Sequence, residues 1–227
     1  MVEQAILHED NHLLALDKPA GMLSQGDATG DLSLVDWASA DLKRRHDKPG
    51  NVYVGLVHRL DRPVSGVILL ARTSKAASRL SEQFRAGAVK KAYRAIVEGN
   101  WPEAEGEWVD TLLKDQQTNL VAVVPAGTHR GQLATLQYKI MNQDAKTTTF
   151  ELRPSTGRGH QLRVQLASRG LPILGDAKYG SRSRIRASDG GHRIALHAES
   201  LEFTHPTRPG AIRVTAAVPA DWPGRGS

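Results

Sequence analysis

Residues 58–72 read His-Arg-Leu-Asp-Arg-Pro-Val-Ser-Gly-Val-Ile-Leu-Leu-Ala-Arg, and the rest of the chain is organised around them. The stretch places one carboxylate, Asp61, between the guanidinium groups of Arg59 and Arg62. A proline and a glycine then break the backbone ahead of an apolar run at 67–71, which has the length and β-branched content of a buried strand. The sequence therefore predicts that this acidic residue lies on a loop that the buried strand supports.

Size and composition describe a globular protein with a basic balance. The chain has 227 residues, of which 40% are hydrophobic and 24% charged, enough for a full core. Its net charge of +6 and pI near 9.7 suit a polyanion such as nucleic acid. Because only 5% of the residues are aromatic, a sheet that stacks several bases at once is disfavoured.

Other classes of protein are excluded or disfavoured. The chain contains no cysteine, which excludes disulfides and thiolate metal sites. No apolar stretch approaches the roughly 20 residues of a membrane helix, and the first residues carry no cationic leader. These features predict a cytoplasmic protein without a membrane segment.

Two short apolar runs at 5–9 and 12–17 flank Asp10-Asn11, which predicts a β-hairpin. The same segment, 8–12, matches the zinc-protease pattern H-E-x-x-H. That chemistry needs a helix, because only there do positions i and i+4 share a face. The flanking runs favour strands and no third ligand follows at a recognisable spacing, so we expect no metal site here.

Two helices and then a series of strands are expected in the next part of the chain. Ser33 is placed to cap a helix over 34–45, and Thr73 or Ser74 begins a second helix that Gly87 ends. Together the elements predict a mixed α/β (α+β) fold. Further strands are expected at 90–98, 107–113, 119–124, 131–141, 147–153, 193–204 and 211–218.

The second informative stretch, 155–180, is expected to open a short helix at 156–157 and to close it at Gly170. His160 and Arg163 lie three positions apart and would project from one side of that helix. Two leucines four positions apart would form its core side, so the helix could aim a histidine and an arginine at one point. The alternative is a surface helix with ordinary cations.

A polar segment at 181–193 contains Arg182, Arg184 and Arg186. It predicts a mobile basic loop that faces RNA. The Pro/Gly-rich residues at the end of the chain are expected to fray.

The chemistry that these residues suit is narrow. A loop carboxylate such as Asp61 can attack a carbon electrophile, and adjacent guanidinium groups favour its ionised form. Isomerising uridine in RNA needs such a nucleophile and a pocket for a base that leaves its stack, but no metal, redox cofactor or nucleotide. On loop chemistry alone, a structural Asp–Arg pair explains Asp61 equally well.

Several separated segments, in this order along nearly the whole chain, resemble the RluA family of pseudouridine synthases. The resemblance implies the pseudouridine synthase fold, in which helices and loops flank a largely antiparallel central sheet around a basic cleft. The segments lie at 16–21, 58–66, 91–95, 156–166, 172–180 and 195–206.

The same resemblance implies a role for individual residues. Asp61 would be the nucleophile and Arg163 its salt-bridge partner. Tyr93 would stack on the target base and could transfer the proton from C5, while Arg59 would fill the gap left by the flipped nucleotide. Further RNA-binding residues would be His58, Arg62, Lys91, Arg158 and His160.

Two positions depart from the family pattern. Val64 stands where the family usually has Thr, and Gln165 where His is frequent. Neither performs the covalent step, so these departures concern neighbouring contacts and RNA preference. The first motif begins at Leu16, which leaves no room for the S4 RNA-binding module that the family often carries, and we expect a single catalytic domain over 1–227.

We therefore expect an enzyme that converts uridine to pseudouridine in structured RNA, either rRNA or tRNA, as a monomer without cofactor, metal or obligate protein partner. One alternative is a non-catalytic RNA-binding or ribosome-assembly protein that keeps the fold. The retained Asp61, Tyr93 and Arg163 speak against it, since RNA binding alone does not need a carboxylate in a basic site. The other alternative, a zinc peptidase, depends on a helix at 8–12.

Overall fold

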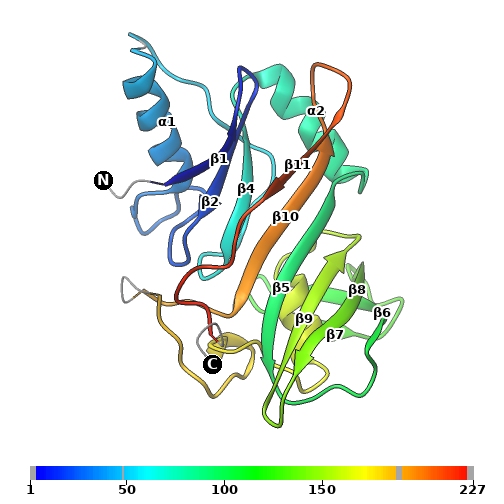
Figure 1. The fold of residues 1–227 in the computed structure, drawn as a ribbon. Coiled ribbons are helices and arrows are strands. Elements are labelled where there is room, and N and C mark those ends of the chain that lie inside the picture. Colours follow the sequence, from blue (N-terminus) through cyan, green and yellow to red (C-terminus); the bar gives the residue numbers. More distant parts are fainter. Residues whose placement is uncertain (1–3, 48, 188–190, 224–227) are drawn as a thin grey trace. The chain divides into compact units, whose positions relative to one another are not determined.

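A computed structural model of the chain divides it into two compact units, and the strands of both belong to one 11-stranded sheet (Figure 1). Unit 1 consists of Met1–Val89 and Ala198–Val218, and unit 2 of Lys90–His197 and Pro219–Ser227. Unit 1 is thus assembled from two separate segments of chain. The predicted single domain over 1–227 stays a prediction. The residues that the structure describes are 4–47, 49–187 and 191–223.

In unit 1 the sheet has the strand order β1-β2-β4-β10-β11, with the short β3 also pairing β4. The predicted hairpin is confirmed, because β1 and β2 pair antiparallel. Strand β4 is buried along its whole length. Gly66 is required there, since its φ is +113° and a Cβ would lie 2.2 Å from the carbonyl oxygen of Ala198 in β10. The strands are β1 (Ala5–Glu9), β2 (Leu13–Lys18), β3 (Gly55–Leu56), β4 (Ser65–Ala71), β10 (Leu196–Thr204) and β11 (Ala211–Thr215).

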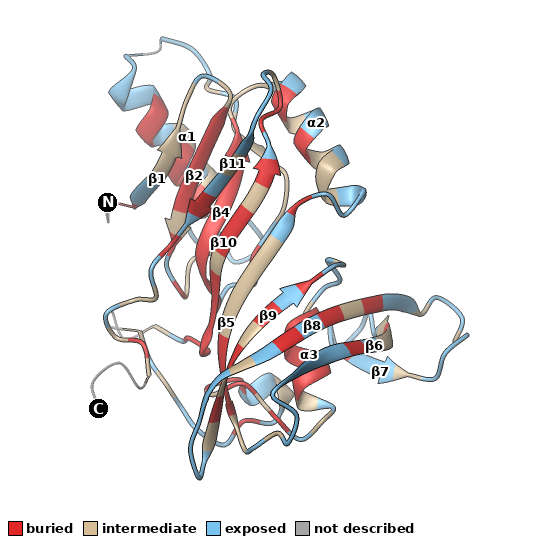
Figure 2. Ribbon diagram, turned by 45° about the vertical axis from the view of Figure 1, so that its right-hand side comes forward, coloured by how far each residue is buried: buried red, intermediate tan, exposed pale blue. Residues whose placement is uncertain are grey.

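Helices α1 (Leu34–Arg45) and α2 (Ser74–Arg85) pack on opposite faces of β2 and β4 (Figure 2). Alternate residues of a strand face opposite sides. Leu14, Leu16, Ile68 and Leu70 therefore meet α1, while Leu13, Val67 and Leu69 meet α2. Each fully buried leucine stabilises the fold by roughly 2 kcal/mol. Both strands are apolar throughout because both of their faces are covered.

Both of these helices begin where the sequence predicted. Ser33 accepts a hydrogen bond from the backbone N–H of Asp36, whose carboxylate accepts one from the backbone of Ser33, a complete capping box. Thr73 caps α2 through the backbone N–H of Ala76. Among the described residues, no helix is long and apolar enough to cross a membrane.

In unit 2 the sheet has the order β5-β9-β8-β6-β7, and neighbouring strands there pair antiparallel. Helix α3 (Gln161–Ala167) contributes Val164 to a cluster with Leu112, Val121 and Ala134. The largely antiparallel mixed α/β fold is therefore confirmed. The strands are β5 (Lys90–Glu98), β6 (Glu105–Lys114), β7 (Val121–Val124), β8 (Gln132–Gln143) and β9 (Thr147–Pro154), and a single 3₁₀ turn, η1, spans Ala177–Tyr179.

The structure corrects two local expectations. Helix α3 begins at Gln161 and not at 156–157, because His160 has a φ of +54° and interrupts the helical backbone. The chain end does not fray where it is described: Trp222 is buried, and Asp221 forms an ion pair with the buried Arg193. Residues 224–227 lie outside the described part of the chain.

Candidate active site

Asp61 lies half-buried in the loop between β3 and β4, in unit 1. Its carbonyl oxygen accepts a hydrogen bond from the N–H of Val64 at 3.0 Å, which closes a tight turn. On one side of Asp61, the Oγ of Ser24 donates to the carbonyl of Leu60 at 2.7 Å and accepts from its N–H at 3.1 Å. On the other side, the N–H of Gly21 donates to the carbonyl of Arg62 at 2.8 Å. The main chain is thus held on both sides of the carboxylate.

A buried lysine lies beneath this loop. The Nζ of Lys18, which is fully buried, donates to the carbonyl oxygens of Pro19 at 3.0 Å, Met22 at 2.8 Å and Arg62 at 3.2 Å. Burial lowers the pKa of Lys18 to about 7, while the attraction of the Asp61 carboxylate raises it. Lys18 is the last residue of β2, and a lysine directly after the apolar run at 12–17 was the signal that the sequence offered.

The three basic residues beside Asp61 have different surroundings. Arg62 forms an ion pair with Asp31 at 2.7 Å and donates through Nε to the carbonyl of Gly21 at 2.9 Å, so it fastens the loop to its own chain. The Nε2 of His58 accepts from the N–H of Leu69 at 2.9 Å. Arg59 is exposed and has no hydrogen bond or ion pair to another described residue. RNA contacts by these three residues stay predictions.

Arg163 occupies the middle of α3 in unit 2 and is only 5% exposed. Its Nε and Nη2 donate to the two carboxylate oxygens of Asp176 at 2.7 and 2.8 Å, and Asp176 is also buried. The guanidinium carbon lies 5.0 Å from the centre of the Tyr179 ring. A bidentate pair fixes the plane of the guanidinium as well as its position. The predicted pairing of Arg163 with Asp61 stays a prediction.

His160 is held by the other end of Tyr179. The Tyr179 hydroxyl accepts from the N–H of Val121 at 3.1 Å and lies 2.7 Å from Nδ1 of His160. The hydroxyl donates to Nδ1 when a neutral His160 carries its proton on Nε2, and accepts from Nδ1–H in the other tautomer. The prediction that His160 and Arg163 project from one side of a helix was wrong, because His160 precedes the helix with a left-handed backbone.

The other predicted residues of unit 2 support the turn that leads into α3. The Nζ of Lys91 donates to the carbonyl of Thr156 at 2.8 Å, and burial lowers the pKa of Lys91 to about 8. The Nε of Arg158 donates to the carbonyl of Leu133 at 3.0 Å. Tyr93 is half-buried in β5, with the β9 residue at position 152 as its strand partner. RNA contacts by Lys91 and Arg158 stay predictions.

The two departures from the family pattern are structural positions. Val64 is buried. The Nε2 of Gln165 donates to Asp110 at 2.7 Å, and the same carboxylate accepts from Arg169 at 3.0 Å. Gln165 therefore belongs to a small polar network on the far end of α3 from His160.

The zinc-protease pattern falls on β1 and the turn after it, and not on a helix. Asp10 in its middle binds His205 at 3.0 Å and Arg208 at 2.9 Å. Hydrogen bonds from the backbone of His12 and from His205 outweigh burial and lower the pKa of Asp10 to about 2. Within the described ranges, no group of three or more acidic or histidine side chains could hold a metal ion.

Comparison with known proteins identifies the family. A family model described as RNA pseudouridylate synthase matches residues 12–168. Ribosomal large subunit pseudouridine synthase C of Buchnera aphidicola is 36% identical over 223 residues, covering 96% of this chain and 67% of the relative. The proteins of the same name from Vibrio cholerae and Escherichia coli are each 34% identical, with 96% and 93% of this chain covered. This chain spans 67% and 65% of those two relatives, or about two thirds of their length.

Solved structures agree with the sequence relatives. Human RNA pseudouridylate synthase domain containing 4 matches with a TM-score of 0.79 and 26% identity, covering 96% of this chain and 90% of that one. Human RNA pseudouridylate synthase domain containing 1 has a TM-score of 0.75 at 22% identity, over 95% and 83% of the two chains, which shows the shared fold.

Proposed function

Because this chain belongs to the RNA pseudouridylate synthase family, in its RluA type, we propose that it isomerises specific uridines to pseudouridine in large-subunit ribosomal RNA. The choice of RNA follows the names of its relatives, which act on the large ribosomal subunit. Transfer RNA is the competing substrate. The protein would work in the cytoplasm as a monomer.

One observation carries the catalytic part of the proposal. The family match includes Asp61, Tyr93 and Arg163, and the arginine is buried and oriented by a bidentate carboxylate. Burying a guanidinium is costly unless its partners are well placed. A protein that only bound RNA would gain more from an exposed arginine, so the buried pair supports an enzyme over the non-catalytic alternative.

In the proposed reaction Asp61 is the nucleophile. Its carboxylate adds to the sugar C1′ or to the base C6, or assists elimination to a glycal-type intermediate; in each case the N1–C1′ bond breaks. The uracil turns while it stays bound, and C5 bonds to C1′. The bond between Asp61 and carbon, where one has formed, breaks and restores the carboxylate, and in the glycal route the proton removed from C2′ returns. C5 loses its proton, and N1 gains one. The atoms of substrate and product balance without an oxidant or co-substrate.

The other residues would support this step. Arg163 would keep the Asp61 carboxylate ionised and oriented. Tyr93 would stack on the uracil and serve in the transfer of the C5 proton. Since the base must leave its stack, Arg59 would fill the gap that remains.

The test is pseudouridine mapping after incubation of the purified protein with protein-free large-subunit rRNA and, separately, with tRNA. We expect new pseudouridine in rRNA, and Asp61→Asn should lower the rate roughly a thousandfold or more. Asp27→Asn, a change at an exposed carboxylate of the same unit, should leave the rate unchanged. Modification of tRNA alone would refute the choice of RNA. Binding of rRNA without product, or full activity of Asp61→Asn, would refute the enzymatic proposal.

A further inference from the structure

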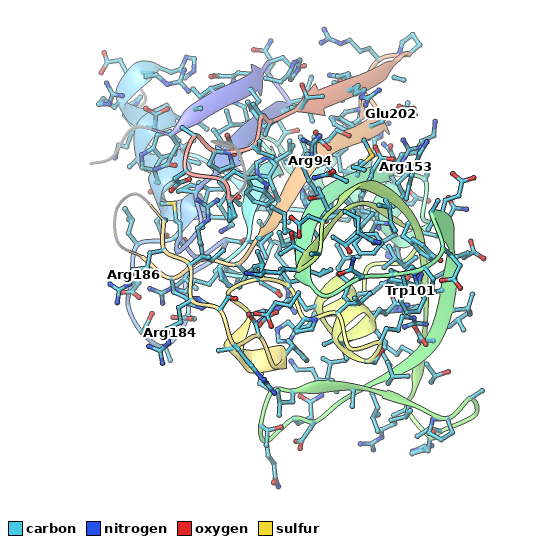
Figure 3. All side chains as sticks on the ribbon, turned by 60° about the horizontal axis from the view of Figure 1, so that its bottom comes forward. Arg94, Trp101, Arg153, Arg184, Arg186 and Glu202 are labelled. Atoms are coloured by element: carbon cyan, nitrogen blue, oxygen red, sulfur yellow. The ribbon has the colours of Figure 1, made fainter. Side chains whose placement is uncertain are left out.

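Three arginines after η1 form a row on the surface of unit 2. Arg182, Arg184 and Arg186 are exposed, and the exposed Ser183 and the half-buried Ile185 lie between them. Figure 3 shows Arg184 and Arg186 reaching outward from the same stretch of loop. We call these three residues the arginine row.

The backbone of the row is anchored by Glu98 at the end of β5. Its Oε1 accepts from the hydroxyl of Ser181 at 2.7 Å and from the N–H groups of Arg182 at 3.1 Å and Ser183 at 2.9 Å. Burial raises the pKa of Glu98, but these hydrogen bonds lower it below its ordinary value. The carboxylate thus binds the loop backbone and leaves the guanidinium groups to other partners.

Further contacts hold the rest of the loop. The Oγ of Ser181 accepts from the N–H of Gly175 at 3.0 Å, and a Cβ on Gly175 would lie 2.5 Å from Ile185. Arg186 pairs with His192 in an antiparallel bridge. The expected mobile loop is therefore anchored over 181–187, and its residues 188–190 lie outside the described part of the chain.

Among the described residues, the charge of the row is uncompensated. Within the described ranges, none of the three guanidinium groups forms a hydrogen bond or an ion pair. No acidic residue occurs in the sequence from 177 to 188. Guanidinium groups bind phosphate oxygens bidentately. Three such groups on an anchored backbone suit a chain of phosphates better than they suit a single anion.

We propose that the arginine row, held in place by Glu98, binds the sugar–phosphate backbone of the RNA substrate. This inference rests on the proposed function, because it assumes that the substrate is RNA. Contacts with the row increase the affinity for RNA and fix the position of the RNA strand, but they recognise no particular base. Glu98 is a positioning residue that holds the backbone from which the arginines extend.

The experiment measures the dissociation constant for protein-free large-subunit rRNA as a function of salt concentration. Each phosphate contact on a single strand contributes roughly 0.7 to the slope of log K against log salt. Replacing all three arginines by glutamine should therefore reduce the slope by about 2 and weaken binding at least roughly tenfold at low salt. The matched control replaces three exposed lysines of the same unit, Lys114, Lys139 and Lys146, and removes the same charge.

A second variant keeps all three arginines but releases their backbone. Glu98→Ala should lower the slope by part of the amount lost in the triple variant, although it raises the net charge. If Glu98 had a purely structural role, Glu98→Ala would change the melting temperature and leave the slope of log K against log salt at its wild-type value. The melting temperature of every variant is measured alongside.

The outcomes separate this inference from the proposed function. An unchanged slope in the triple arginine variant, or an equal loss in the lysine control, overturns the arginine row while wild-type pseudouridine formation stands. An equal effect of the triple variant on binding of polyglutamate would assign the row to acidic proteins and also overturn it. A wild-type protein that neither binds nor modifies rRNA or tRNA refutes the proposed function itself.

Discussion

The Asp61 loop of unit 1 and the Arg163 helix of unit 2 hold their charged residues by different means. Around Asp61 the main chain is fixed, because the Lys18 ammonium and Ser24 bind backbone groups on either side of it. Around Arg163 the side chain is fixed, by a direct bond to Asp176. The backbone bonds that hold the Asp61 loop would therefore remain in an Asp61 variant, whereas a change of one member of the buried pair removes the bond that fixes the other.

The largest loss of stability is expected from Asp176→Asn. It leaves the buried Arg163 without its counter-charge and should lower the free energy of unfolding by about 3–5 kcal/mol. Urea denaturation measures this. Asp31→Asn is the control, since it removes an exposed carboxylate that is paired with Arg62 and should cost less than about 1 kcal/mol.

A double change sharpens the same point. Replacing Arg163 by Met together with Asp176 by Leu removes both charges and should recover most of the lost stability. Pseudouridine formation should not recover, because Arg163 is proposed to act on Asp61. A cost below about 1 kcal/mol for Asp176→Asn would remove the contrast between the two regions.

In unit 1, Lys18→Met should cost about 2–3 kcal/mol, since three buried carbonyl groups lose their donor while the cost of burying an ammonium is relieved. The pH dependence is more specific. Because burial lowers the pKa of Lys18 from 10.5 to about 7, the unfolded chain binds the proton more tightly than the folded one. This lysine therefore adds stability as pH rises from about 7 toward 10.5, by at most about 1.4 kcal/mol per pH unit.

Urea denaturation of wild type and Lys18→Met across this pH window measures that contribution. The rise should be present in the wild type and reduced in the variant, and below about pH 7 the two curves should run parallel. Parallel curves across the whole window would show that burial does not lower the pKa of Lys18.

Tyr179→Phe should have a smaller effect, of about 1–2 kcal/mol, because it removes one hydroxyl that bonds Val121 and His160. The ring beside Arg163 remains. Tyr53→Phe, at an exposed tyrosine, is the control and should be neutral. Thermal unfolding of the two variants distinguishes them, and equal melting temperatures would mean that the hydroxyl of Tyr179 does not support the turn before α3.

The smallest effect on stability is expected at Asp61. Asp61→Asn should change the free energy of unfolding by no more than about 1 kcal/mol, because the backbone bonds beside Asp61 remain, although it is expected to lower the rate roughly a thousandfold or more. Urea denaturation of the variant that is used for the activity assay measures both properties on one preparation. A loss of several kcal/mol would show that the carboxylate itself holds the loop.

Local signals in the sequence predicted most of the elements. The capping box of Ser33 and Asp36 lies within four residues, and the apolar strands show directly in composition. The start of α3 could not be read in the same way, because the backbone of His160 is fixed by a contact with Tyr179, 19 residues away. Helix propensity carries no information about such a contact.

The same limit applies to the candidate site. Asp61 and Arg163 stood out by their motifs, but the groups that hold them did not. The carbonyl of Arg62, which accepts a hydrogen bond from Lys18, is 44 residues from that lysine in the sequence. Asp176 is 13 residues from Arg163. Because a buried lysine or aspartate is recognised by its partners, only the folded structure reveals these two.

Unit 1 is made of two segments with the whole of Lys90–His197 between them. During synthesis β4 emerges early, yet in the sheet it lies between β2 and β10. Only glycine fits at position 66, because the backbone of Ala198 in β10 lies so close. On the nascent chain one edge of this apolar strand must stay unpaired until β10 leaves the ribosome, which makes it a site for chaperones or for misassociation. The strand that supports Asp61 is thus translated early, but its pairing in the sheet is completed only late.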